Sequence, residues 1–210
     1  DIEDTLRVQR DYSLGFETKT PESGFDTYGG KGTYFADVRL SNEGLRGKGY
    51  LEYLTSTSWS GDYRFFPDSC NTLADKFIIE EQFTPVEYPE VSAINVFQHW
   101  EPYEDFMTVK YTDIPIDMFN KQSKLLGKLV LSPEKLTGAG TMSFEDAEMK
   151  SKLYAFKQHE IFADSADFSL KSAEYIQSAF ATNNYKSHID FNERTGNFVS
   201  NGGASFVEFP

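Results

Sequence analysis

The sequence predicts an all-β protein, an elongated and mainly antiparallel repeat sheet built from two tandem units of about 91 residues. Three observations lead to this fold class. The chain resembles itself at a fixed spacing, and several segments alternate apolar and polar residues as half-buried strands do. No long segment has a helical pattern in both copies. We expect either a β-solenoid or an open jelly roll.

The repeat is clearest in residues 40–49 (LSNEGLRGKG) and 131–140 (LSPEKLTGAG), which are identical at six of ten positions at an offset of 91. Unrelated segments of ordinary composition would share roughly one. At the same offset, three residues of the first copy, Ser60, Tyr63 and Phe65, meet Ser151, Tyr154 and Phe156. At an offset of 92, residues 74–75 meet 166–167, and residues 105–108 meet 197–200.

The fixed period defines the structural unit before any strand is assigned. We divide the chain into an N-terminal strand or lead-in at 1–24, a first unit at 25–115 and a second unit at 116–210, continuous in one folded body. The chain starts and stops abruptly, so we also expect it to be a segment or processed form of a longer protein.

The strands are predicted from alternation and from turn residues. In residues 34–40, Tyr, Ala, Val and Leu alternate with Phe, Asp and Arg, and residues 91–100, 125–131 and 189–191 behave similarly. The linkers 41–44 and 132–135 suit hairpins built around a type I turn. In that register Val38 faces Gly47 and Ala36 faces Gly49, and the paired Gly-x-Gly leaves space for a bulky neighbour or a close backbone.

One segment is ambiguous by propensity alone. Residues 145–158 consist of good helix formers, but their counterpart at 54–67 is rich in Ser, Thr and aromatic residues, which favour strands. Because two copies of one unit should share one fold, we predict that both segments are extended.

Composition excludes several classes of function. With 39% hydrophobic residues, 19 Phe and 12 Tyr, the chain has enough core material to fold. The formal charge of -13 repels phosphate backbones, so we expect no nucleic-acid partner. No apolar run approaches the roughly 18 to 20 residues that span a bilayer, so the sequence predicts a soluble chain that does not span a membrane.

No catalytic, metal or cofactor site is predicted. Cys70 is the only cysteine and is expected to be an inert core or strand-edge residue. The histidines, His99, His159 and His188, are far apart and lack ligand spacing. Residues 29–32 (GGKG) lack the Walker spacing of a phosphate-binding loop and are interpreted as a turn.

Acidic and aromatic residues give two weaker leads. Residues 101–105 and 113–117 concentrate carboxylates such as Asp105, Asp113 and Asp117, which calcium prefers, but neither segment matches a calcium loop. Trp59, Trp100 and Tyr103 are candidates for stacking on sugar rings, although cross-strand packing is the commoner role of such residues.

Beyond the shared Leu-Ser-x-Glu-x-Leu-x-Gly-x-Gly pattern, residues 163–170 (ADSADFSL) and 188–201 (HIDFNERTGNFVSN) resemble large uncharacterised repeat proteins of Bacteroidetes. The resemblance covers most of the chain from about residue 24 and implies an exported, periplasmic or surface-exposed location in the bacterial cell envelope. The rhythm of short strands is also similar to OstA-like and AsmA-like β-scaffolds, which form open, grooved sheets that guide lipid between membranes.

The sequence therefore leads to two hypotheses of function. The first is a non-enzymatic scaffold module of a larger envelope protein, whose partners are neighbouring repeat units. The alternative is a binding module, for lipid in an apolar groove or for glycan on an aromatic face.

Overall fold

The computed structural model describes residues 14–16, 21, 23–41, 43–171, 178–202 and 206–208. Sixteen strands form one sheet, and the single helical element in this part of the chain is a 3-10 turn at Pro102–Glu104. The predicted all-β class is confirmed.

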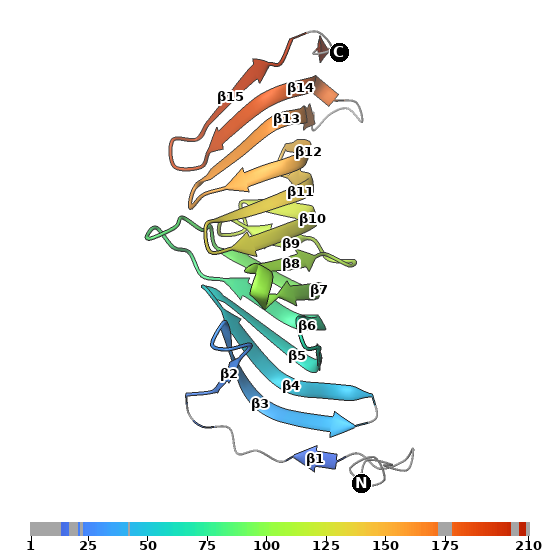
Figure 1. Ribbon diagram of the computed structural model, residues 1–210. Coiled ribbons are helices and arrows are strands. Elements are labelled where there is room, and N and C mark those ends of the chain that lie inside the picture. Colours follow the sequence, from blue (N-terminus) through green and yellow to red (C-terminus); the bar gives the residue numbers. More distant parts are fainter. Residues whose placement is uncertain are drawn as a thin grey trace.

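Most strands pair with the next strand along the chain, and all of the strand pairings are antiparallel. The molecule is therefore a long meander, stacked from β1 at one end to β15 at the other (Figure 1). The strands are β1 Leu14–Phe16, β2 Phe25–Thr27, β3 Gly32–Ser41, β4 Gly44–Tyr53, β5 Ser56–Phe65, β6 Cys70–Ile79, β7 Val91–Glu101, β8 Phe106–Lys110, β9 Ile116–Met118, β10 Ser123–Ser132, β11 Lys135–Ser143, β12 Ala147–Phe156, β13 Glu160–Lys171, β14 Ser178–Asp190, β15 Thr195–Ser200 and β16 Phe206–Glu208.

Both predicted hairpins are present. The β3–β4 turn closes where Ser41 pairs with Gly44, and the β10–β11 turn closes where Ser132 pairs with Lys135. Val38 lies opposite Gly47 and Ala36 opposite Gly49, as the turn length predicted. A Cβ added to Gly47 would lie 2.4 Å from the Tyr34 hydroxyl, and one on Gly49 would lie 2.1 Å from the Phe35 carbonyl oxygen. Both predicted reasons for glycine therefore hold in this hairpin.

The ambiguous segment 145–158 and its predicted counterpart 54–67 are both extended, as β12 and β5. Its residues alternate between the core and the solvent, with Ala147, Met149 and Ser151 buried. Burial of one face of the strand therefore overrides the helix propensity of these residues. The predicted strands at 91–100 and 125–131 lie within β7 and β10, whereas the one at 189–191 is only the end of β14, with Phe191 beyond it.

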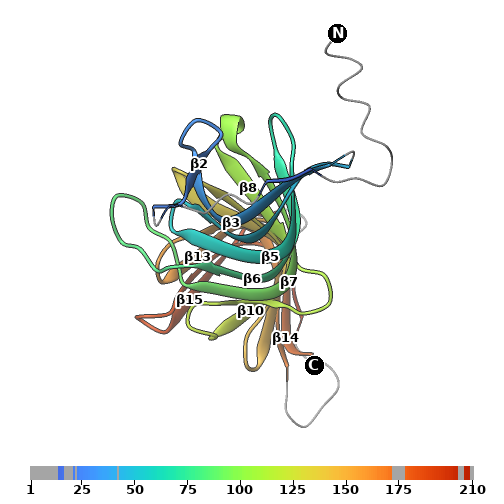
Figure 2. The same cartoon turned by 90° about the horizontal axis from the view of Figure 1, so that it is seen from below.

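A row of irregular positions crosses the middle of the long strands. The β4–β5 register shifts between Gly47 and Gly49, and the β11–β12 register shifts between Gly138 and Gly140. Regular β5–β6 pairing stops after Trp59 and resumes at Arg64. Bulges bend a strand and increase its twist, and the strands accordingly curve around the body (Figure 2).

The bends fold the sheet lengthwise into two walls. Tyr63 makes this visible, because its hydroxyl donates a hydrogen bond of 2.7 Å to the carbonyl of Ser58 in the same strand. Five residues of a straight strand would span roughly 16 Å. Wall A comprises residues 32–35, 50–53, 56–59 and 76–79 of β3–β6, and wall B comprises residues 37–41, 44–47, 63–65 and 70–73. In β10–β13 the residues 91 positions later form the continuation of the same two walls.

Side chains from the two walls fill the space between them. The Tyr34 ring of wall A lies 5.5 Å from the Tyr63 ring of wall B, and Tyr53 lies 5.1 Å from Trp100. Tyr34, Tyr63 and Trp100 are among the largest fully buried side chains. One cluster of buried residues continues from Tyr34 in β3 to Phe168 in β13, so the core has no break at residue 115.

The pairing pattern of β3–β6 recurs in β10–β13 at an offset of 91. Val38 opposite Gly47 corresponds to Leu129 opposite Gly138. The Tyr63 brace also recurs, since the Tyr154 hydroxyl donates a hydrogen bond of 2.7 Å to the Met149 carbonyl. That the two runs are copies of one unit stays a prediction, developed under the proposed function.

One part of the sequence alignment is wrong. Residues 105–108 align with 197–200 by sequence at an offset of 92, but the strand register gives 89. Thr108 pairs with His99 in β7, and Asn197 pairs with His188 in β14. Fewer residues separate β13 from β14 than separate β6 from β7, which accounts for the change of offset. Val109 is therefore the counterpart of Phe198.

Candidate functional site

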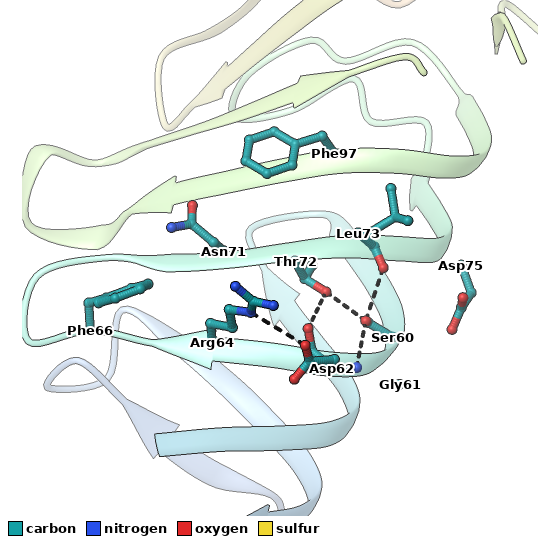
Figure 3. A pocket seen from close by; sticks show the side chains of 10 residues that line it. All are labelled: Ser60, Gly61, Asp62, Arg64, Phe66, Asn71, Thr72, Leu73, Asp75 and Phe97. Carbon is teal, nitrogen blue, oxygen red and sulfur yellow. Dashed lines mark hydrogen bonds and ion pairs between the residues drawn. The ribbon is translucent and has the colours of Figure 1, made fainter. Parts of the chain in front are cut away.

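A hollow of about 610 Å³ opens on the outer face where β5–β6 pairing is interrupted (Figure 3). Ser60 and Thr72 bridge the gap, because the Thr72 hydroxyl donates to Ser60 Oγ at 2.6 Å and the Ser60 hydroxyl donates to the Leu73 carbonyl at 3.0 Å. Above them lie exposed Leu73 and Phe97. The polar groups of the gap are thus satisfied by one another.

A similar hollow of about 410 Å³ interrupts β12–β13, where Ser151 takes the place of Ser60. The Ser151 hydroxyl donates to the Ser165 carbonyl at 2.7 Å. Because the two hollows share the bridging serine but few of their outer residues, we interpret them as part of the bend in the sheet.

The single thiol is structural. Cys70 is fully buried at the start of β6, and this burial raises its pKa to about 12. The thiolate, the reactive form of cysteine, is therefore scarce in the folded protein. The prediction of a core residue is confirmed.

Each histidine lies near one glutamate, and the three pairs are separate. The nitrogen–oxygen distances are 3.3 Å for His99–Glu101, 3.6 Å for His159–Glu81 and 3.1 Å for His188–Glu160. Within the residues that the structure describes, no group of three or more His, Cys, Asp and Glu side chains could hold one metal ion.

The acidic segments do not converge on one point. The Asp105 carboxylate forms an ion pair of 2.7 Å with the Lys31 ammonium, and the Asp117 carboxylate forms one of 2.6 Å with the Lys124 ammonium. Asp113 accepts a hydrogen bond from its neighbour Thr112. Residues 29–31 lie in the β2–β3 turn, as predicted, with Gly29 at φ 69° and Gly30 at φ 83°, and Gly32 begins β3.

The three aromatic candidates do not form a common platform. Trp100 is fully buried, Trp59 lies on the outer face beneath the Lys76 ammonium, and Tyr103 is 58% exposed beside Tyr28. Next to Trp59, the rings of Phe35 and Tyr50 stack on each other at 4.4 Å, so each occupies a face that a sugar ring would need.

The open side between the two walls is closed by contacts that sequence reasoning missed. From the β2–β3 turn of wall A, the Tyr28 hydroxyl donates to the carbonyls of Phe66 and Ser69 at the β5–β6 turn of wall B. From the loop 80–90, the Tyr88 hydroxyl donates to the Ser132 carbonyl at 2.6 Å. The two walls are thus joined across their open side at these two places.

Pairs of short strands recur along the sheet. β1 and β2 together cover the outer edge of β3, one on each wall, and β8 and β9 do the same for β10. The match is close, because Asp26 pairs with Thr33 in β3 and Asp117 pairs with Lys124 in β10, each 91 residues later. β15 and β16 form a third such pair on the far edge of β14.

The third pair differs from the second in its neighbouring strands. β8 and β9 lie between β7 and β10, whereas β15 and β16 pair with β14 alone among the described strands. Their outer edges are therefore open within the described part of the chain.

Beside this edge lies an apolar hollow of about 610 Å³, the strongest candidate site in the described residues. Both walls and β15 contribute to it. Its apolar side chains are Phe144, Ala147, Phe168, Leu170, Ile189, Phe191 and Phe198. Arg194 and Asp190 lie at its rim.

In the first half the corresponding positions are covered. Leu170 is 40% exposed, but its counterpart Ile79 is 1% exposed. Phe198 is half-buried, whereas Val109 is 1% exposed under Leu129 of β10. The corresponding residues of the first half are therefore buried, whereas those that line the hollow are partly exposed.

The sequence also carries a signal for this end that the self-alignment of the chain missed. At a spacing of 91, Phe25-Asp26, Ile116-Asp117 and Val207-Glu208 repeat an apolar–acidic pair, each in the second strand of a short pair. The sequence also predicts that strands containing Phe198, Phe206 and Phe209 are partly exposed at this edge; Phe198 is half-buried, and the side chains of Phe206 and Phe209 lie outside the described residues.

Comparison of the chain with protein-family models, curated proteins and solved structures found no match. In the part of the chain that the structure describes, no helix is long and apolar enough to cross a membrane.

Proposed function

We propose that the chain is a non-enzymatic structural module of a larger bacterial cell-envelope protein, in which units of 91 residues stack end to end in one sheet. The observation that carries the proposal is the recurrence of strand order, β3 to β8 and then β10 to β15, each run preceded by a short strand, β2 or β9, around one uninterrupted core. Proteins whose repeats contact only their neighbours are extended scaffolds whose length is set by repeat number.

The junction at which β8 and β9 pair with β10, here called the seam, supports this proposal, because its strands pair and bury side chains as the other strands of the sheet do. Val109 of β8 pairs with Leu129 of β10, and both are 1% exposed. β9 pairs with both β7 and β10, and its residues Ile116 and Met118 are fully buried. A second unit therefore completes the core of the first.

The reactive side chains favour a structural role over an enzymatic one. The Cys70 thiol is buried and stays neutral, and each histidine is near a glutamate of its own in a different part of the sheet. The assignment to the envelope rests on the resemblance of residues 163–170 and 188–201 to Bacteroidetes repeat proteins.

The second candidate is a binding module for lipid. The hollow lined by Phe144, Phe168 and Phe198 favours it, because apolar cavities of a few hundred Å³ suit an acyl chain. A glycan-binding face has less support, since the Phe35 and Tyr50 rings stack on each other and Trp100 is buried.

Removal of one repeat tests the scaffold proposal. Deleting residues 59–149, which are 91 in number, joins Ser58 to Lys150 and keeps the inward alternation of the joined strand. The control deletes residues 59–148, one residue fewer, which shifts the downstream side chains to the opposite face of the strand. We expect a cooperative thermal transition with β-type circular dichroism only for the first variant. Equal melting of the two variants would refute a 91-residue unit.

A further inference from the structure

We propose that β15 and β16 together form a docking edge for one antiparallel strand of ten residues, the length of β3 and β10, supplied by a further unit of the same kind. This inference deepens the proposed function and rests on it. It names the partner of the open end and the way in which the partner binds.

The first support is the geometry of the edge. At the seam one long strand, β10, pairs with both members of a short pair, with β8 through residues 128–131 and with β9 through residues 123–125. β15 and β16 lie on β14 in the same registers as β8 and β9 lie on β7, since His188–Asn197 matches His99–Thr108 and Ala181–Glu208 matches Ser92–Asp117. The edge that β8 and β9 offer to β10 is therefore repeated by β15 and β16 at the C-terminal end of the sheet.

The second support is the hollow beside the edge. At the seam, β9 and β10 supply the buried apolar residues Ile116, Met118, Leu125 and Leu129. The hollow of about 610 Å³ at the open end lacks such a cover among the described residues, and Leu170 there is 40% exposed. A strand with apolar residues at alternate positions would place them over Phe168 and Phe198.

The third support is the cost of leaving such an edge open. A strand edge presents unpaired N–H and C=O groups and favours pairing with another strand. β15 lacks two of the usual protections of an edge strand, since its sequence TGNFVS has neither proline nor charge. Val199, 63% exposed on its outward face, is the counterpart of Lys110 in β8. The composition of β15 therefore suits a strand that is covered in the assembled protein.

The test appends the proposed partner to the chain. Residues 120–144, which comprise a turn and the β10–β11 hairpin, are joined directly after Pro210. This junction is in register, because Phe209-Pro210 align with Met118-Phe119 at an offset of 91. The matched control carries Leu125→Asn and Leu129→Asn in the appended copy only, which removes its inward apolar side chains.

Hydrogen exchange is then measured for the amides of residues 195–200. We expect at least tenfold slower exchange in the extended chain than in the original chain and the control, with unchanged exchange in β3. Equal exchange in all three chains would overturn the docking edge. A fluorescent fatty acid distinguishes a lipid site, because saturable binding that persists unchanged in the extended chain would also overturn it.

A second copy of the chain is the remaining competitor. If β15 pairs with itself, analytical ultracentrifugation will show a dimer that also forms in the extended chain, which contradicts the proposal. Failure here is separable from failure of the scaffold proposal. If the 91-residue deletion variant folds but the extension does not slow exchange at residues 195–200, the scaffold proposal is supported and only the docking-edge proposal is refuted.

Discussion

A few residues determine how the sheet folds onto itself. Tyr63 and Tyr154 cross from wall B to wall A and donate to backbone carbonyls five residues earlier in their own strands. The residue paired with each tyrosine on the neighbouring strand is a glycine, Gly47 or Gly138, and its missing side chain leaves room for the rings of Phe65 and Phe156. Burial raises the pKa of both tyrosines above its usual value, so both remain hydrogen-bond donors throughout the physiological pH range.

Substitution of one glycine tests this role. In Gly47→Ala the added Cβ would lie 2.4 Å from the Tyr34 hydroxyl and 3.0 Å from the Phe65 ring. We expect a loss of about 1–3 kcal/mol in the free energy of unfolding, measured by urea denaturation, because overpacking forces neighbours to move. The control is Gly61→Ala in β5, where a Cβ meets no atom within 4 Å. Equal stability of the two variants would contradict the close packing.

At the scale of elements, the strands alone do not close the molecule. The loop 80–90 between β6 and β7 crosses from wall A to the β10–β11 turn of wall B, where Tyr88 is 2% exposed. Two contacts of this loop reach the second half, Glu81 at 3.6 Å from His159 and an ion pair of 4.0 Å between Glu87 and Lys157. The loop therefore ties the two halves together across the open side of the sheet.

Removal of one hydroxyl tests the loop as a clasp. Tyr88→Phe keeps the buried ring but loses the 2.6 Å bond to the Ser132 carbonyl, so we expect a loss of about 1–2 kcal/mol in stability. Hydrogen exchange at the amides of Gln82 and Tyr88, which bond each other's carbonyls, should become faster. Tyr103→Phe, at a site 58% exposed, is the matched control and should change neither quantity. An unchanged exchange rate in Tyr88→Phe would show that the loop is held by other contacts.

The elements differ in how far sequence could predict them. The two hairpins follow from turn length and alternation, and β12 is predicted against its helix propensity because residues 54–67 could not be helical. The loop 80–90 could not be predicted, because its contacts to Ser132 and Lys157 join distant residues without periodicity. The alignment of residues 105–108 with 197–200 was wrong for a related reason. The connection between β13 and β14 has fewer residues than the one between β6 and β7, and this difference changes the strand register without leaving a sequence pattern.

At the scale of the whole molecule, the seam decides whether the chain is one body or two. Leu129 of β10 lies against Val109 of β8, and both belong to the cluster that runs through the two halves. The Trp residues, Trp59 and Trp100, both lie in the first half, so their fluorescence reports on that half, whereas far-UV circular dichroism reports on all strands. The two signals together can therefore detect a loss of coupling.

For the wild-type chain we expect the two signals to change at the same denaturant concentration, because a shared core makes unfolding cooperative. Leu129→Ala should lower the free energy of unfolding by about 2–5 kcal/mol, because it opens a cavity at a residue that is 1% exposed. Both midpoints should therefore fall together. Leu153→Ala, 57% exposed on the outer face of β12, should leave both midpoints nearly unchanged. If the fluorescence midpoint of Leu129→Ala stays at the wild-type value while the circular dichroism curve splits, the halves unfold independently. The shared core would then not couple them, and the scaffold would be a string of separate units instead of one continuous sheet.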